Sequence, residues 1–142
     1  MAKTLQCEIV SAEQPLFSGA VKMIIATGSE GELGILPGHT PLLTGLKAGP
    51  VRIKMADDSE EVFYVNGGYL EVQPNVVTLL ADTAARAKDI DEAAAEEARQ
   101  RALEVIEGKR SDIDYTVAAA QLAESVAQIR AVQQMRKKFG AK

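Results

Sequence analysis

The chain has 142 residues, of which 46% are hydrophobic and 25% charged, and its formal net charge at pH 7 is −4. This composition is typical of a globular protein with a core, and the acidic balance argues against nucleic-acid binding. The sequence contains no apolar run of 18 residues and no secretion signal, so we expect a cytosolic chain that does not span a membrane. The single Cys7 excludes an internal disulfide, and we expect it to be a small buried hydrophobe.

The first part of the chain shows the pattern of β-structure. Val51 to Met55 alternates apolar and basic residues, and Asn66-Gly67-Gly68 is a strong signal for a tight turn between two strands. Short strands at this spacing predict an antiparallel sandwich or flattened barrel. The predicted strands are 4–10, 21–27, 42–46, 51–55, 61–65, 69–72 and 76–81, with a short extended piece at 13–19.

The stretch from Gly31 to Gly45, GELGILPGHTPLLTG, combines several glycines, two prolines and the only histidine, His39. It is too apolar for a solvated linker and too interrupted for a helix. Glycine permits backbone angles that other residues avoid, and proline fixes φ. This pattern therefore predicts a half-buried loop whose backbone conformation is specified.

The pattern changes after Ala81. We expect a linker at 84–88, and from Asp89 onward the chain has no proline and is rich in Ala, Glu, Gln, Arg and Lys, which favours helix. The acidic start and Gly108 predict one helix over 91–107 and a second over 113–138. We therefore divide the chain into a β domain, residues 1–86, and a helical hairpin, residues 87–142.

The facing stripes of the two helices are predicted from their spacing. They are Ala95, Ala98, Ala102 and Val105 on the first helix, and Tyr115, Ala119, Leu122, Val126 and Ile129 on the second. Because alanine buries little apolar area, we expect a tightly but weakly closed hairpin that can switch between two states.

The end of the chain is basic, since residues 108–142 carry 7 Lys or Arg against 3 Asp or Glu. The basic side chains near the C-terminus include Arg130, Arg136, Lys137 and Lys138. They are interpreted either as a solvated helix end that complements the helix dipole or as a contact for an acidic partner surface.

The sequence holds no constellation that would make it an enzyme. It has no phosphate-binding loop, dinucleotide fingerprint or nucleophile elbow. His39 has no second histidine to share a metal ion, and we interpret it as a structural hydrogen-bonding residue rather than a catalytic one. No cofactor is expected, apart from the nucleotide considered below.

Three segments, SAEQPLFSG, GSEGELGILPGHTPLLTGLKAG and NGGYLEVQPNVVTLLADTA, followed by an Ala-rich hairpin, resemble the epsilon subunit of the bacterial F-type ATP synthase. The resemblance implies an α+β fold, a ten-stranded antiparallel β-sandwich followed by two antiparallel helices. It implies a non-catalytic rotor subunit of the central stalk that couples gamma to the c-ring and inhibits ATP hydrolysis through mobile helices. Such a subunit is peripheral, on the cytoplasmic face of the bacterial inner membrane.

The resemblance also implies roles for particular residues. Glu32 would face the polar loops of the c-ring, and His39 would lie near the gamma subunit. The basic residues of the second helix, Arg130, Arg136, Lys137 and Lys138, would meet an acidic segment of the beta subunit in the catalytic head of alpha and beta subunits.

One departure concerns nucleotide binding. Family members that bind ATP carry Ile/Leu-Asp-x-x-Arg-Ala at the start of the first helix, and here Ile90 and Asp91 are followed by Ala94 at the arginine position. Without that guanidinium ATP binding is expected to be weak, with Arg99 only partly compensating. The alternative functions are an ATP-sensing module whose hairpin closes on nucleotide and an enzyme that uses His39.

Overall fold

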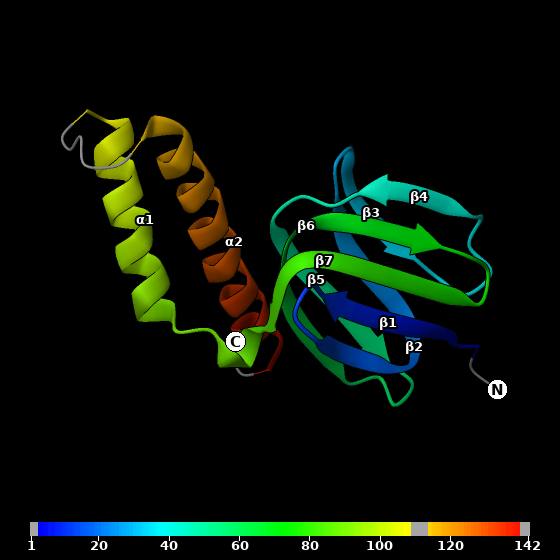
Figure 1. Ribbon diagram of the computed structural model, residues 1–142. Helices are drawn as coiled ribbons and strands as arrows, with labels where there is room; N and C mark the ends of the chain where they lie inside the picture. The colour runs from blue at the N-terminus through cyan, green and yellow to red at the C-terminus, as the bar shows by residue number, and fades with distance from the viewer. Residues whose placement is uncertain (1–2, 109–113, 140–142) are drawn as a thin grey trace.

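The computed structural model describes residues 3–108 and 114–139, which form a β-sandwich followed by two antiparallel helices (Figure 1). This architecture confirms the predicted fold class. The elements are β1 (Leu5–Ser11), β2 (Pro15–Gly28), β3 (Gly31–Ile35), β4 (Leu42–Gly45), β5 (Gly49–Met55), β6 (Glu60–Val72), β7 (Val76–Arg86), the 3-10 helix η1 (Ala87–Asp89), α1 (Glu92–Ile106) and α2 (Tyr115–Phe139).

The strands follow the order β1-β7-β6-β5-β2-β3, and β4 pairs with β6. A further pairing of β1 with β2 closes the order into a ring, so the sandwich is also a flattened barrel. The pairs of neighbouring strands are antiparallel except for β1 and β7, which run parallel. Closure leaves few free strand edges that could pair with other chains.

The structure has seven strands rather than about ten, and two pairs of predicted segments merge into the longer strands β2 and β6. The predicted hairpin turn at Asn66-Gly67-Gly68 is wrong, since β6 runs through it and stays paired with β7 on both sides. Gly67 and Gly68 have φ of 72° and 109°, conformations that favour glycine. They bend β6 at the point where its pairing changes from β5 to β4. The glycines therefore mark a bend within one strand and not a turn between two.

Two other predicted segments also merge. The pieces at 13–19 and 21–27 form the single strand β2, whose first half pairs with β1 and whose second half pairs with β3 and β5. The strand predicted at 76–81 continues as β7 to Arg86, so the predicted linker at 84–88 is the end of that strand plus the start of η1.

The core lies between the two layers of strands and consists mainly of Val, Ile, Leu and Ala side chains. Phe63 is fully buried within it and packs edge-to-face on Phe17, with ring centroids 5.9 Å apart. Cys7 is fully buried, which confirms its prediction as a core hydrophobe. Burial, aided by the charge of Glu8, raises the pKa of the Cys7 thiol to about 12.

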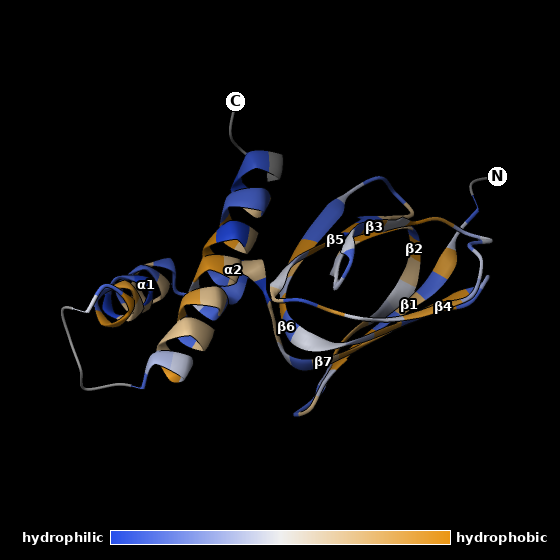
Figure 2. Ribbon diagram, turned by 90° about the horizontal axis from the view of Figure 1, so that it is seen from above, coloured by the Kyte–Doolittle hydropathy of each residue, from blue (hydrophilic) through white to orange (hydrophobic). Residues whose placement is uncertain are grey.

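The two helices begin and end close to their predicted bounds. Asp91 is the N-cap of α1, and its carboxylate accepts a hydrogen bond of 3.1 Å from the backbone N–H of Ala94. Gly108, at φ 83°, follows the last turn of α1. Helix α2 lies between α1 and the sandwich in both views (Figures 1 and 2), so it is the inner helix of the hairpin.

Candidate functional site

The loop that contains His39 is shaped by backbone hydrogen bonds. The N–H of Gly38, at φ 85°, donates to the carbonyl of Pro74 at 2.9 Å, which fastens the loop to the turn between β6 and β7. The N–H of His39 donates to the carbonyl of Leu36 at 3.1 Å, and its ring Nδ1 lies 2.7 Å from the carbonyl oxygen of Thr40. The histidine is half-buried and is held by its own loop.

Glu32 lies on β3, at an edge of the strand order, and its side chain is exposed. Its register partner on β2 is Thr27. Glu32 and His39 form no hydrogen bond or ion pair with each other, so they are two separate surface residues. Their roles in contacting partner subunits stay predictions.

An apolar patch covers the outer face of β1, β4, β6 and β7. Tyr69 and Leu80 are register partners, and Val10 is the next partner of Leu80 across the sheet. On β4, Gly45 is the register partner of Tyr69, and Leu43 lies two residues before Gly45. Leu43 therefore lies on the same face of the sheet as Tyr69. Leu43, Tyr69 and Leu80 are 69%, 61% and 53% exposed. We call Val10, Leu43, Tyr69 and Leu80 the outer patch.

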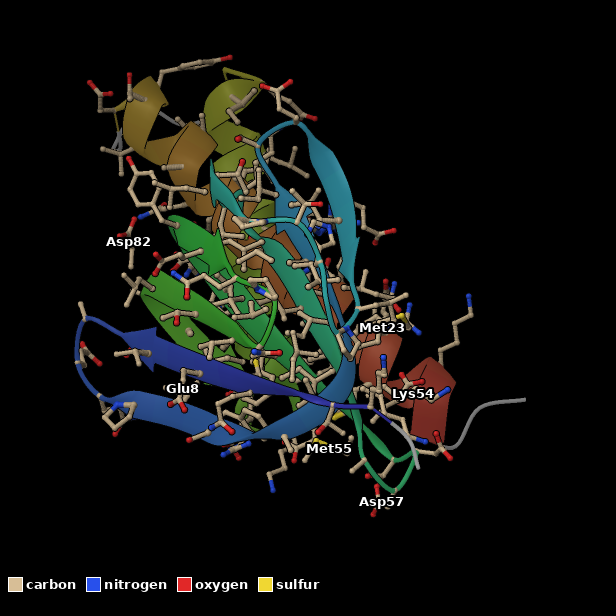
Figure 3. The ribbon with its side chains drawn as sticks, turned by 90° about the vertical axis from the view of Figure 1, so that its right-hand side faces the viewer. Glu8, Met23, Lys54, Met55, Asp57 and Asp82 are labelled. Atoms are coloured by element: carbon tan, nitrogen blue, oxygen red, sulfur yellow. The ribbon has the colours of Figure 1, made fainter. Side chains whose placement is uncertain are left out.

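The surroundings of the outer patch are acidic and hollowed. A hollow of about 260 Å³ beside Tyr69 and Leu80 is also lined by Val10 and Asp82. Glu71 is the partner of Leu43, and Glu8 lies two residues before Val10 on β1. In Figure 3, Glu8 and Asp82 lie on one side of the sandwich, and Lys54 and Asp57 lie on the other. An apolar surface bordered by carboxylates fits a partner with an apolar centre and a basic rim.

A second outer face of the sandwich is covered by α2. Ala127 and Ala131 on this helix pack with Val62 and Tyr64 of β6, and Met135 and Ile90 lie at the edge of the same cluster. The phenol of Tyr64 donates a hydrogen bond of 3.3 Å to the carboxylate of Glu124. Burial, with a contribution from the charge of Glu124, raises the pKa of Tyr64 to about 12.

The residues predicted to face each other in the hairpin differ in how deeply they are buried. Ala95 and Ala102 on α1 are buried, whereas Ala98 and, on α2, Leu122, Val126 and Ile129 are half-buried. Tyr115 and Ala119, which were expected on the same stripe, are exposed, and Ala118, Ser125 and Val132 are buried instead. Ala118, Ser125 and Val132 lie seven residues apart and so share one side of α2. Each is one residue before or three after a predicted position, so this buried stripe is rotated by about one residue from the prediction.

Three of the four predicted basic contacts, Arg130, Arg136 and Lys137, are exposed, and one of them has a partner within the chain. Arg130 and Lys137 are exposed, and Arg136 forms an ion pair with Glu92 of α1, with 2.6 Å between Nη2 and Oε1. The side chain of Lys138 lies outside the described residues. In this arrangement of the hairpin Arg136 therefore links α2 to α1.

Each residue predicted for nucleotide binding has a capping, packing or ion-pairing role within the chain. Ile90 caps η1 and packs at the edge of the cluster under α2, and Asp91 caps α1. Arg99 forms an ion pair with Glu96 one turn earlier on its own helix, and Ala94 is exposed. Within the described residues the Asp91 carboxylate is therefore bonded to the backbone of its own helix, and Arg99 to a carboxylate of that helix.

Arg86 stabilises the junction between the two parts of the chain. Its guanidinium lies 5.1 Å from the centroid of the Phe63 ring, pairs with Glu61 at 2.8 Å and donates to the carbonyl of Leu16 at 2.7 Å. Hollows of about 250 and 420 Å³ flank Arg86. The smaller hollow is also lined by Lys88 and Glu61 and the larger one by Asp89, so the lining of each contains both a cationic and an acidic side chain.

Within the described ranges, no group of three His, Cys, Asp or Glu side chains is placed to hold a metal ion. None of the helices in those ranges combines the length and apolar character needed to cross a bilayer.

Sequence reasoning missed the outer patch and the sheet-facing side of α2. The alternation of Tyr69 and Glu71 with the buried Leu70 and Val72 indicates a strand with an outer aromatic residue, and it was the available signal for the patch. Ala127 and Ala131 gave no comparable signal, because two alanines in an Ala-rich helix do not identify a face.

Comparisons with known proteins agree with this architecture. Residues 4–87 match the family model described as "ATP synthase, Delta/Epsilon chain, beta-sandwich domain", and residues 88–133 match "ATP synthase, Delta/Epsilon chain, long alpha-helix domain". The chain is 62% identical over 135 residues to the ATP synthase epsilon chain of Chromohalobacter salexigens, covering 95% of this chain and 96% of the relative.

Solved structures share the fold at low sequence identity. A chain of the Euglena gracilis mitochondrial ATP synthase aligns over 94% of this chain and 80% of its own length, with a TM-score of 0.70 and 18% identity. A chain from the central stalk and c-ring of the Tetrahymena thermophila enzyme aligns over 94% and 96%, with a TM-score of 0.58 and 17% identity. Because the two family models together span most of its length and an epsilon chain matches it at high identity, the chain belongs to the ATP synthase delta/epsilon family.

Proposed function

We propose that the sandwich of this non-catalytic subunit docks on the gamma subunit and the polar loops of the c-ring, while its hairpin inhibits ATP hydrolysis. The observation that carries the proposal is the unequal use of the sandwich surface. One outer face is covered by α2, and another presents the outer patch to solvent. A chain with one face reserved for its own helices and one apolar face left open is suited to joining a larger assembly.

The outer patch supports a docking role on the gamma subunit. Its apolar side chains are supplied by paired β-strands, three of which belong to the closed ring, so the surface needs little ordering when a partner binds. The carboxylates of Glu8, Glu71 and Asp82 around it would attract a basic rim on gamma. His39, in a loop fastened to the turn after β6, is proposed to contact gamma as well, and Glu32 on the exposed edge strand is proposed to face the c-ring.

The basic end of α2 supports the inhibitory role. Arg130 and Lys137 are exposed in the docked hairpin, and Arg136 would be released from Glu92 if the helices separated. We propose that these side chains, together with Lys138, then meet an acidic segment of the beta subunit next to alpha. The assembly would hold the chain at the cytoplasmic face of the bacterial inner membrane, where it is peripheral.

Replacement of Leu80 by Glu tests the docking proposal, because it places a carboxylate in the centre of the outer patch without disturbing the core. We expect binding to the isolated gamma subunit to weaken at least about tenfold, which corresponds to about 1.4 kcal/mol. The control is Ala56→Glu, which adds the same charge at an exposed turn between β5 and β6. Equal affinities for the parent and Leu80→Glu would contradict docking through this patch.

A further inference from the structure

The hairpin is held to the sandwich through α2, whose docked side carries small side chains. Ala127 and Ala131 pack against Val62 and Tyr64, and Ala48 and Ala85 lie at the edge of the same cluster. Glu124, Ala127 and Ala131 are spaced so that they fall on one side of the helix. A surface built largely of alanines is smooth and buries little apolar area per residue, so it fixes the position of the helix only weakly.

A polar contact lies within this interface. The phenol of Tyr64 is 3% exposed, and it donates to the half-buried carboxylate of Glu124 at 3.3 Å. The side chains of Thr83 and Asn66 act in the opposite direction to Glu124 and lower the pKa of Tyr64, so the surroundings of the phenol on the sandwich are polar. Removing Glu124 would leave the buried phenol with fewer partners, and removing the hydroxyl would leave a half-buried carboxylate without its donor.

We propose that the Tyr64–Glu124 hydrogen bond is the latch of the docked hairpin: it fixes the register of α2 on the sheet and must break before the hairpin leaves the sandwich. The inference rests on the proposed function only in giving the undocked hairpin its inhibitory role. Helix α1 packs on α2 and is tied to it by the Glu92–Arg136 ion pair, so it leaves together with α2. The latch thus determines how often the hairpin leaves the sandwich and carries the basic end of α2 away from it.

An engineered thiol beneath the helix tests the latch in the full-length chain. Ala131→Cys places a thiol at a fully buried position of the interface, where a thiol reagent reaches it when α2 undocks. Cys7 is buried in the sandwich core and reports unfolding of the sandwich in the same sample. The variants to compare in this background are Tyr64→Phe, Glu124→Ala and their double variant. Glu97→Ala, the same change at an exposed position of α1, is the control.

We expect Tyr64→Phe and Glu124→Ala each to accelerate labelling of the Ala131→Cys thiol roughly fivefold to tenfold, the effect of losing one ordinary hydrogen bond, because this bond is long and its carboxylate is only half-buried. The double variant should be no faster than the faster single variant, because both remove the same bond. Labelling of Cys7 and the rate in Glu97→Ala should stay at the parent values. Unchanged rates in both single variants, additive effects in the double variant, or parallel acceleration at Cys7 would overturn the latch. Because the measurement uses the isolated chain, its outcome is independent of whether the hairpin inhibits the assembled enzyme.

Discussion

Glu92, in the first turn of α1, and Arg136, near the end of α2, form an ion pair with 2.6 Å between Oε1 and Nη2. The pair joins the two helices at the end of the hairpin that carries the basic residues. Hydrogen bonding and charge from Glu92 raise the pKa of Arg136 above its ordinary value. Arg136 therefore has a partner inside the chain, whereas the sequence indicated either a solvated helix end or a contact with a partner subunit.

Arg136→Ala should loosen the hairpin only slightly. Both side chains are more than a third exposed, at 58% and 38%, so solvent screens the pair and its loss should lower the free energy of unfolding by less than about 1 kcal/mol. Thermal unfolding of the parent and the variant at low and high salt would measure this, and the difference should shrink as salt increases. A loss above about 2 kcal/mol that does not depend on salt would contradict the screened-pair interpretation.

Gly68→Ala should be strongly destabilising. Gly68 has φ of 109°, and an added Cβ would lie 2.0 Å from the carbonyl oxygen of Leu80, so the bend in β6 could not be kept. We expect a loss of at least about 3 kcal/mol in denaturant-induced unfolding, from backbone strain and the clash together. Gly34→Ala is the matched control, since an added Cβ there meets no atom within 4 Å. Equal stability of the two variants would show that the bend does not require Gly68.

The stability of the fold should decrease in alkaline solution. Burial raises the pKa of Cys7 from 9.0 to about 12 and that of Tyr64 from 10.0 to about 12. Both groups hold their protons more tightly in the folded state, so above about pH 9 the unfolded state loses protons first and the free energy of unfolding falls towards pH 12. Below about pH 9 their contribution is constant.

Urea unfolding at a series of pH values would test this titration. Cys7→Ala should be less stable than the parent at every pH because it leaves a cavity, but its stability should fall less steeply above about pH 9. Parallel pH dependences for the parent and Cys7→Ala would contradict a buried, protonated thiol.

The isolated chain should bind ATP weakly. Ala94 replaces the motif arginine, Arg99 is paired with Glu96, and Asp91 serves as the N-cap of α1. Calorimetric titration with ATP and Mg²⁺ should give millimolar or undetectable affinity. A micromolar dissociation constant would favour the nucleotide-sensing alternative and would require another cationic site.

The sequence was sufficient for the features that depend on local pattern. The N-cap at Asp91, the helix stop at Gly108 and the core position of Cys7 follow from capping and alternation, and the structure has all three. The bend at Gly67 and Gly68 was mistaken for a turn, because positive φ is required equally by a tight turn and by a strand that changes partners. The choice between the two depends on pairing with β4 and β7, which is a long-range contact.

The sites divide in the same way. Glu32 and His39 are predicted contact residues because they lie in a recognisable segment, and they stay predictions. The outer patch requires knowing that Tyr69 and Leu80 are neighbours across two strands. The sheet-facing side of α2 could not be predicted, because its alanines resemble those of the α1-facing side. The contact between Tyr64 and Glu124 joins residues 60 positions apart and has no local signal.

The central claim is that the sandwich joins the assembly while the hairpin inhibits hydrolysis. The most direct measurement compares ATP hydrolysis by the assembled synthase carrying the full chain with one carrying residues 1–87, across ADP concentrations and with and without membrane energisation. We predict that the truncated chain still enters the assembly and that hydrolysis increases under the conditions in which the full-length assembly is inhibited. Incorporation of the truncated chain with hydrolysis rates unchanged under all conditions would contradict the account.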